Sequence, residues 1–380
     1  MSKKTVFRLV IFVVMICFQS VSFSQDEDRF IEYDETLSDV RPQWAPSGEY
    51  IGFVSWYGGE PNIWVVRPDG SGLAHLTEAD DAPNVEFSIA PNSDLIAYTS
   101  DTPEFTDIRV FHLNTLEDIG LRQSFGDDLF PILGGLQWSP DGRYISFLAS
   151  GNDRTKLVLY DVEAGQAVDL ASEAGVLYNR YTWSPDSEHL MVAREIVEDG
   201  RITIEIISLD GERETLIYDA TLGMAFGCVP LSITEIDWSI RDLLLVGFSC
   251  PNDAQGEFHV LEMAIFDLDG KLIKQLTNDD SQPLEGVNAS WSPSGDRIVF
   301  QSEGNYPAYV NDTTDVLVTA VEDWQTINLT FDRIRHNGFA AWSPDGSKIA
   351  FEATEGNDID IWVMDADGTN RRNLTPTDQR

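Results

Sequence analysis

The stretch AWSPDGSKIAFEATEGNDIDIWVMDADGTNRRNLT, from Ala341 to Thr375, has the pattern of one compact unit of turns and short strands. Its Ser-Pro-Asp-Gly predicts a tight turn, because proline presets φ, aspartate caps the local backbone and glycine accepts a positive φ. An alternating strand over Lys348–Ala353 follows, and then a second strand over Ile361–Met364. A further turn, Asp-Ala-Asp-Gly, leads to a polar strand that ends in Asn-Leu-Thr. With the short apolar strand before the tryptophan, this predicts a small antiparallel sheet of four strands.

The same unit recurs along almost the whole chain, beginning with QWAPSGEYIGFVSWYGGEPNIWVVRPDGSGLAHLT at residues 43–77. Each copy has one anchor residue directly before or within its first turn. The anchors are Trp44, Ile89, Trp138, Trp183, Trp238, Trp291 and Trp342. Their spacing runs from 45 to 55 residues. A repeat of this length that contains four strands is typical of a β-propeller blade.

A closed ring explains the pattern better than an open solenoid. One four-stranded sheet cannot bury both of its faces, whereas sheets stacked radially bury each face against a neighbour. The middle strands are accordingly apolar and the last strand of each repeat is polar. We therefore expect an all-β, seven-bladed propeller in which the first and last repeats are neighbours. Six or eight blades remain alternatives, because residues 26–41 could supply a strand that fastens the last sheet to the first.

The last repeat, residues 342–375, resembles the repeats of TolB-type β-propellers, which are known as WD40-like PD40 repeats. The resemblance is carried by WSPDG, by the IAF that follows it and by IWVMDADGTNRRNLT. The resemblance covers roughly residues 30–380 and implies the propeller fold. It says less about function, because the motif residues hold turns and core positions. The resemblance is incomplete: the TolB family looks like a six-bladed propeller that follows an α/β domain, whereas this chain shows seven repeats. TolB's contact with an outer-membrane lipoprotein is therefore not carried over.

The N-terminal segment has the layout of a secretory signal peptide. It contains in order Lys3, Lys4, Arg8, the apolar run Leu9–Phe18, and the small residues Ser22 and Ser24. This predicts a signal peptide over residues 1–24 and a single propeller domain over residues 25–380. The apolar run is short for a membrane span, although a signal anchor is the alternative. We expect an exported protein, periplasmic or extracellular, with no membrane insertion once the signal is removed.

The composition is strongly acidic, with 25 Lys+Arg against 64 Asp+Glu and a net charge of -39. Binding to nucleic acid or to an anionic membrane requires a basic face, so neither partner is expected. Basic proteins or peptides, cations and uncharged sugars remain open as ligands. The alternative is that the charge only keeps the protein soluble.

Two cysteines remain after the signal segment, Cys228 and Cys250, on either side of the fifth anchor. That repeat has WSIRD in place of WSPDG, with a first strand ending at Trp238 and a second beginning near Leu243. In an antiparallel pair about this turn, facing residue numbers sum to about 480. The numbers of the two cysteines sum to 478, so their side chains should lie nearly opposite each other. In an exported protein this predicts a disulfide, and two buried thiols are the alternative.

No catalytic set is evident, so an enzyme is the less favoured interpretation. The chain lacks G-x-S-x-G, and its five histidines have no metal-ligand spacing. These are His75, His112, His189, His259 and His336. No cofactor is expected apart from a divalent cation such as calcium, for which only fragments of a binding loop are present. Because similar propellers are polysaccharide lyases with a histidine-bound metal, a metal-dependent carbohydrate-active enzyme is the alternative function.

The strongest functional signal lies in loops that should open on one face, around the mouth of the central channel. They comprise the loops that enter the first strands and those between the second and third strands. Their candidate ligand-binding residues are Trp56, Tyr57, Asp80, Asp81, Asp127, Asp128, Asp279, Asp280, Tyr306, Tyr309 and Arg335. Carboxylates with aromatic anchors predict a non-enzymatic scaffold that binds a protein or peptide, and we expect the chain to be a monomer. The alternative is that these aspartates only cap turns.

Overall fold

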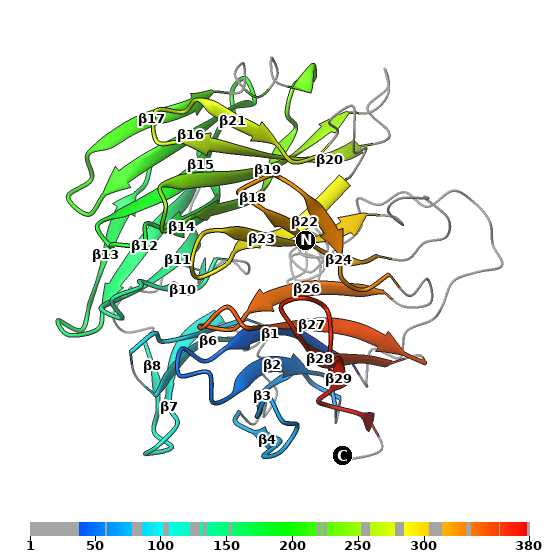
Figure 1. Ribbon diagram of the computed structural model, residues 1–380. Coiled ribbons are helices and arrows are strands. Elements are labelled where there is room, and N and C mark those ends of the chain that lie inside the picture. The colour runs from blue at the N-terminus through cyan, green and yellow to red at the C-terminus, as the bar shows by residue number, and fades with distance from the viewer. Residues whose placement is uncertain are drawn as a thin grey trace, which may run out of the picture.

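The computed structural model describes residues 38–57, 59–77, 86–92, 94–101, 106–121, 130–131, 135–151, 154–218, 222, 226–251, 259–277, 285–303, 314–331, 336–356 and 358–377. These residues form seven antiparallel sheets arranged as a seven-bladed β-propeller, as predicted (Figure 1). Within the same residues, no helix has the length and apolar character that crossing a membrane requires.

Each blade is built from consecutive strands that run from the inner edge to the outer edge. Blade 1 consists of β1 (Asp39–Trp44), β2 (Ile51–Ser55), β3 (Asn62–Val66) and β4 (Ala74–His75). Blade 2 consists of β5 (Phe87–Ile89), β6 (Leu95–Asp101), β7 (Thr106–His112) and β8 (Asp118–Gly120). Blade 3 consists of β9 (Phe130–Pro131), β10 (Gln137–Trp138), β11 (Tyr144–Gly151), β12 (Arg154–Asp161) and β13 (Gln166–Ala171). Since β9 and β10 both pair with β11, they act as two parts of one interrupted inner strand.

The remaining four blades have the same order. Blade 4 consists of β14 (Val176–Trp183), β15 (His189–Ile196), β16 (Arg201–Ser208) and β17 (Arg213–Tyr218). Blade 5 consists of β18 (Ser232–Trp238), β19 (Leu243–Pro251), β20 (His259–Asp267) and β21 (Leu272–Gln275). Blade 6 consists of β22 (Glu285–Trp291), β23 (Arg297–Glu303), β24 (Val316–Ala320) and β25 (Thr326–Asn328). Blade 7 consists of β26 (Asn337–Trp342), β27 (Lys348–Glu355), β28 (Asp358–Asp365) and β29 (Arg372–Asn373).

The hydrophobic core is divided among the interfaces between blades. Apolar clusters lie between successive blades from blade 1 to blade 7. A further cluster joins Phe53 of blade 1 to Ala350 and Ile361 of blade 7, which closes the ring. Figure 1 shows β1 and β2 beside β26 to β28 at this closure. The first and last repeats are therefore neighbours, as the sequence predicted.

Blade 7 closes against blade 1 without sharing a strand in the described part of the chain. The suggestion that residues 26–41 fasten the last sheet is wrong for the residues that are described, because Asp39–Arg41 belong to the inner strand of blade 1 and pair with β2. Residues 26–37 lie outside the described residues. Across this seam, the indole N–H of Trp44 donates to the carbonyl oxygen of Ala341 at 3.1 Å. Face-to-face packing thus holds the first and last blades together.

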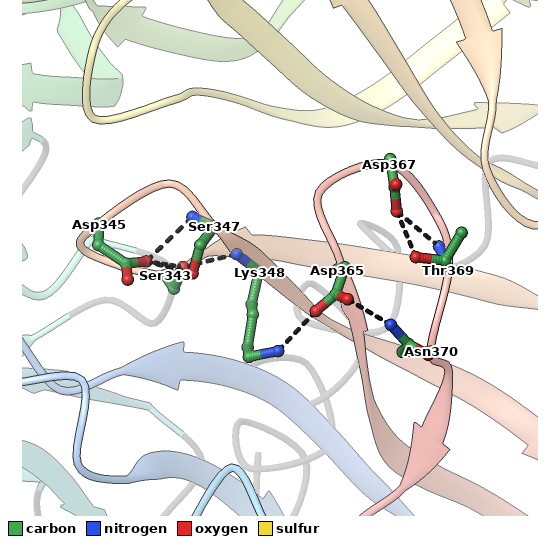
Figure 2. Close-up of polar contacts among 8 residues, drawn as sticks. All are labelled: Ser343, Asp345, Ser347, Lys348, Asp365, Asp367, Thr369 and Asn370. Carbon is green, nitrogen blue, oxygen red and sulfur yellow. Dashed lines mark hydrogen bonds and ion pairs between the residues drawn. The ribbon is translucent and has the colours of Figure 1, made fainter.

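The Ser-Pro-Asp-Gly turns of blades 3 and 7 are held by their own side chains, as Figure 2 shows for blade 7. In blade 7, Ser343 Oγ donates to Asp345 Oδ1 at 2.7 Å, and the backbone N–H of Ser347 donates to the same oxygen at 2.9 Å. Gly346 takes a φ of 68°. The N–H of Lys348 closes the turn by donating to Ser343 Oγ at 2.9 Å. These motif residues are therefore structural.

Blade 5 makes the equivalent turn without proline or glycine. Asp242 takes a left-handed φ of 57°, and Arg241 Nε donates to the carbonyl oxygen of Ser294 in the blade 6 turn at 2.8 Å. Its inner strand ends at Trp238 and its second strand begins at Leu243, as predicted. Contacts with the neighbouring turn stabilise this conformation.

The structure joins Cys228 and Cys250 in a disulfide, with Cα atoms 5.9 Å apart. The strand register behind the prediction was slightly wrong. Ser232 faces Ser249 and Trp238 faces Leu244, so facing numbers sum to 481 or 482. The shift arises at a bulge between Ile233 and Glu235. Cys228 lies before the inner strand begins, so the disulfide ties the connection entering β18 to the end of β19.

Candidate functional site

Most residues of the predicted loop rim lie outside the described residues. These are Asp80, Asp81, Asp127, Asp128, Asp279, Asp280, Tyr306, Tyr309 and Arg335. Trp56 and Tyr57 are described, and both are half-buried. Trp56 packs against the apolar cluster between blades 1 and 2. Tyr57 meets Trp64 edge-on, with ring centroids 6.3 Å apart, and Trp64 stacks on His75 at 5.0 Å.

In several blades, a threonine hydrogen bond fixes the end of the outer strand, where the connection to the next blade begins. In four blades, a threonine that follows the outer strand accepts the backbone N–H of a third-strand residue. The pairs are Ile63 with Thr77 at 3.0 Å, Met263 with Thr277 at 2.7 Å, Val316 with Thr330 at 2.8 Å, and Ile361 with Thr375 at 3.0 Å. Since the outer strands all run in the same direction within their blades, these threonines lie at one face of the propeller. The aspartate pairs at 80–81 and 279–280 follow two of them closely in sequence.

A second polar feature surrounds the propeller axis. Side chains from the inner region of each blade reach the inner-strand backbone of the next blade. We call this set the inner polar ring. Its members are Gln43, Glu86, Ser88, Gln137, Arg180, Glu235, Asp237, Gln301 and Glu352. Except for Glu352, all of them are half-buried, as expected beside a narrow channel.

Donor side chains link the early blades. Gln43 Nε2 donates to the carbonyl oxygen of Phe87 at 2.8 Å, between blades 1 and 2. Between blades 3 and 4, Gln137 Nε2 donates in the same way to the carbonyl oxygen of Tyr181 at 3.0 Å. Between blades 4 and 5, Arg180 Nε donates to the carbonyl oxygen of Thr234 at 3.0 Å.

Acceptor side chains link the remaining interfaces. Glu86 Oε1 accepts the N–H of Leu136 at 2.8 Å, and Glu235 Oε1 accepts that of Asn288 at 3.1 Å. Gln301 Oε1 accepts the N–H of Phe339 at 3.4 Å, and Glu352 Oε1 accepts that of Arg41 at 2.6 Å. Every interface of the ring therefore carries such a bond.

The acidic members of the ring have unusual proton affinities. Burial raises the pKa of Glu235 to about 7, against the opposing charge of Arg180. It also raises the pKa of Glu352 to about 7, opposed by the backbone N–H and the charge of Arg41. The pKa of Asp237 is raised by burial as well, although it accepts the N–H of Trp291 at 2.9 Å. Near neutral pH Glu235 and Glu352 can hold a proton or offer a carboxylate to a cationic group.

The sequence interpretation missed the ring because it concentrated on loops. A signal was present: several ring residues stand one or three positions before an anchor, as Gln43 does before Trp44 and Glu235 before Trp238. Comparing the repeats position by position would have shown polar residues alternating there with apolar ones.

One group of three potential metal ligands occurs among the residues that the structure describes: Asp186, Glu188 and His189, with donor atoms within 4.8 Å of one another. Its turn explains the arrangement. Asp186 Oδ1 accepts the hydroxyl of Ser184 at 2.5 Å and the N–H of Glu188 at 3.0 Å, as the equivalent aspartate does in blade 7. The described histidines otherwise lie in separate blades.

Known proteins share the repeat and the fold. No model of a known protein family matches the sequence. The Tol-Pal system protein TolB of Anaeromyxobacter sp. (strain K) is 37% identical over 105 residues, which span 25% of this chain and 23% of the relative. The match thus covers about a quarter of that relative's length.

Among solved structures, TolB from Acinetobacter baumannii aligns over 85% of this chain and 76% of its own, with a TM-score of 0.50 and 15% identity. An oligogalacturonate lyase in complex with manganese aligns over 86% of this chain and 88% of its own, with a TM-score of 0.62 and 14% identity. At such identities, the structural matches speak to the fold alone. The chain is thus a seven-bladed β-propeller that resembles TolB in fold and, over part of its length, in repeat sequence.

Proposed function

We propose that this chain is an exported, monomeric binding scaffold that holds a protein or peptide partner at the face where connections enter the inner strands. The observation that carries the proposal is the closed ring, since it brings connections from distant parts of the sequence to one rim. The net charge of -39 favours a basic partner surface. Export is inferred from the signal-like segment at residues 1–24.

The name of one relative supports a role that involves other proteins. The TolB of Anaeromyxobacter is named as a protein of the Tol-Pal system. A rigid propeller suits binding, because its strands fix the positions of the loops that make contact. The half-buried members of the inner polar ring, such as Glu235, could offer further hydrogen bonds to a segment that reaches the axis.

A matched pair of charge variants tests the proposal. The rim variant neutralises four carboxylates on the proposed binding face. The control neutralises four carboxylates in turns between third and fourth strands, which lie at the opposite face. The rim changes are Asp80→Asn, Asp81→Asn, Asp279→Asn and Asp280→Asn. The control changes are Asp69→Asn, Asp210→Asn, Asp269→Asn and Asp367→Asn.

Partners captured from envelope extract with the wild-type mature chain would be purified, and their affinities measured by calorimetry. We expect the rim variant to lose at least about tenfold in affinity and the control to keep it, because charges at an interface act locally. Equal affinities for the two variants, or no specific partner at all, would exclude this binding face.

The second candidate is a metal-dependent carbohydrate-active enzyme, favoured by the fold shared with the oligogalacturonate lyase. Metal analysis of the purified chain and an assay on uronic-acid polymers test it directly. A stoichiometric metal together with polymer cleavage would replace the scaffold proposal. A bound calcium ion without cleavage would instead identify a cofactor of the acidic loops.

A further inference from the structure

The seam between blades 7 and 1 differs from the other blade interfaces. At every other interface the chain itself passes from one blade to the next, whereas in the described residues no segment crosses this seam. Its stability rests on an apolar cluster around Phe53 and Ile361 and on two hydrogen bonds from β1 to β26 and β27. One is the indole bond of Trp44 to Ala341, and the other joins Arg41 to Glu352.

The Arg41 N–H needs a partner for a local reason. Arg41 has a left-handed φ of 58°, and the pairing of β1 with β2 shifts between Val40 and Gln43. Such a bulge takes a backbone N–H out of the strand ladder, and a buried N–H without an acceptor costs free energy. Glu352 Oε1 supplies that acceptor from the neighbouring blade at 2.6 Å.

The neighbouring interface makes the same contact with a neutral side chain. Gln301 and Glu352 each stand ten residues after their anchors, Trp291 and Trp342. Gln301 Oε1 accepts the N–H of Phe339, which also has a left-handed φ, of 43°. In blade 6 the acceptor for this backbone N–H is therefore the amide of Gln301, which cannot titrate. In blade 7 it is the carboxyl group of Glu352, which can.

The surroundings of Glu352 favour its protonated form. The side chain is 8% exposed, and it faces Gly338 on β26 and Ile361 on β28, neither of which carries charge. Arg41 on β1 opposes this preference, because its backbone N–H and its charge both favour the ionised form, but burial outweighs them. Burial raises the pKa of Glu352 to about 7, above its ordinary value of 4.5. Moving β1 away from β27 would return the carboxyl group to water and to its ordinary proton affinity.

We propose that Glu352 is a proton-controlled latch of the seam: its protonated form favours closure of blade 7 on blade 1, and its ionised form favours opening. The latch goes beyond the proposed binding role and does not depend on it. Because the closed state has the raised pKa, its advantage is complete below about pH 4.5 and is lost as the pH rises to about 7. The expected change in the opening equilibrium is on the order of 100-fold.

Hydrogen exchange of β1 and β27 amides tests the latch. Protection would be measured from pH 5 to pH 8, corrected for intrinsic exchange rates and compared with β15 and β16 in blade 4. In the wild type we expect seam protection to fall on the order of 100-fold across this range, relative to blade 4. Glu352→Gln should remove that dependence. The control Glu355→Gln, at an exposed position of the same strand, should keep it.

A second variant moves the latch to another interface. Gln301→Glu should install a similar pH dependence in the β26 amides, because it places a carboxyl group at the equivalent acceptor position. This readout keeps the proposal testable if Glu352→Gln does not fold. Identical pH profiles for the wild type and Glu352→Gln, or no new dependence in Gln301→Glu, would overturn the proposal.

Discussion

Asp345 illustrates how a single side chain shapes each repeat. Its carboxylate accepts the N–H of Ser347 and the hydroxyl of Ser343, and these bonds lower its pKa to about 2. Nearby, Lys348 Nζ pairs with Asp365 at 2.6 Å and links the first turn of the blade to the second (Figure 2). The repeat motif is therefore a set of turn-forming bonds.

Replacing Asp345 with alanine should lower the free energy of unfolding by about 1–2 kcal/mol, because three turn bonds to this solvent-exposed carboxylate, from Ser343 and Ser347, are lost. The wild-type contribution should be present above about pH 3.8 and lost as the pH falls toward 2, since the folded-state pKa is lowered. Urea denaturation at pH 7 measures the effect. Glu49→Ala, at an exposed position of the blade 1 turn, is the control, and an equal loss there would contradict the explanation.

Glu235 should make stability depend on pH in the opposite sense. Its folded-state pKa is raised to about 7, so its stabilising contribution is complete below pH 4.5 and is lost as the pH rises to about 7. We expect Glu235→Gln to reduce the difference between pH 5 and pH 8 unfolding free energies by about 1–3 kcal/mol. Urea midpoints of the two proteins at both pH values measure it. An unchanged pH dependence would mean that Glu235 is solvated in the folded protein.

Among the structural elements, the connection into β18 is tied down by the disulfide between Cys228 and Cys250, 22 residues apart. Phe226 packs edge-on against Phe248 beside it, with ring centroids 4.8 Å apart. Replacing both cysteines with serine should lower the free energy of unfolding by about 2–4 kcal/mol.

Reductant provides the internal control for this prediction. Dithiothreitol should lower the urea midpoint of the wild type toward that of the double variant, and it should leave the double variant unchanged. Should reductant leave the wild type unaffected as well, the disulfide would contribute nothing to stability.

The sequence was sufficient to predict the elements whose causes are local. Proline, aspartate and glycine determine the turns, and the anchors from Trp44 to Trp342 mark the inner strands. Strand order and the favoured count of seven blades, with six or eight as alternatives, were therefore predictable. The bulges were not predictable in the same way. Arg41, Asn288 and Phe339 adopt positive φ although none is glycine, and each shifts the pairing register of its strand.

The inner polar ring could not be predicted because its partners come from different repeats. Glu352 contacts Arg41 across 311 residues, and Glu235 contacts Asn288 across 53. Which side chain meets which N–H depends on the bulges and on blade packing. Trp56 is a further example: its sequence position suggests an exposed loop, but its indole packs against the core between blades 1 and 2.

At the scale of the whole molecule, closure of the ring gives the loops their common face. Apolar contact between blades 7 and 1 and the Glu352 bond hold the seam in the described residues. Any loss of closure would separate connections that the proposed binding function needs together. The position of blade 7 against blade 1 is therefore the central structural claim.

Cross-linking across the seam tests this claim most directly. Asp69 of blade 1 lies near enough to Arg372 of blade 7 for the two charges to interact. The double variant Asp69→Cys with Arg372→Cys should be joined rapidly by a short bismaleimide, giving an intramolecular product visible by peptide mass spectrometry. Asp69→Cys with Asp210→Cys, which places the second thiol on blade 4, should not be joined. Equal yields for the two pairs, or no product from the first, would contradict the closed ring.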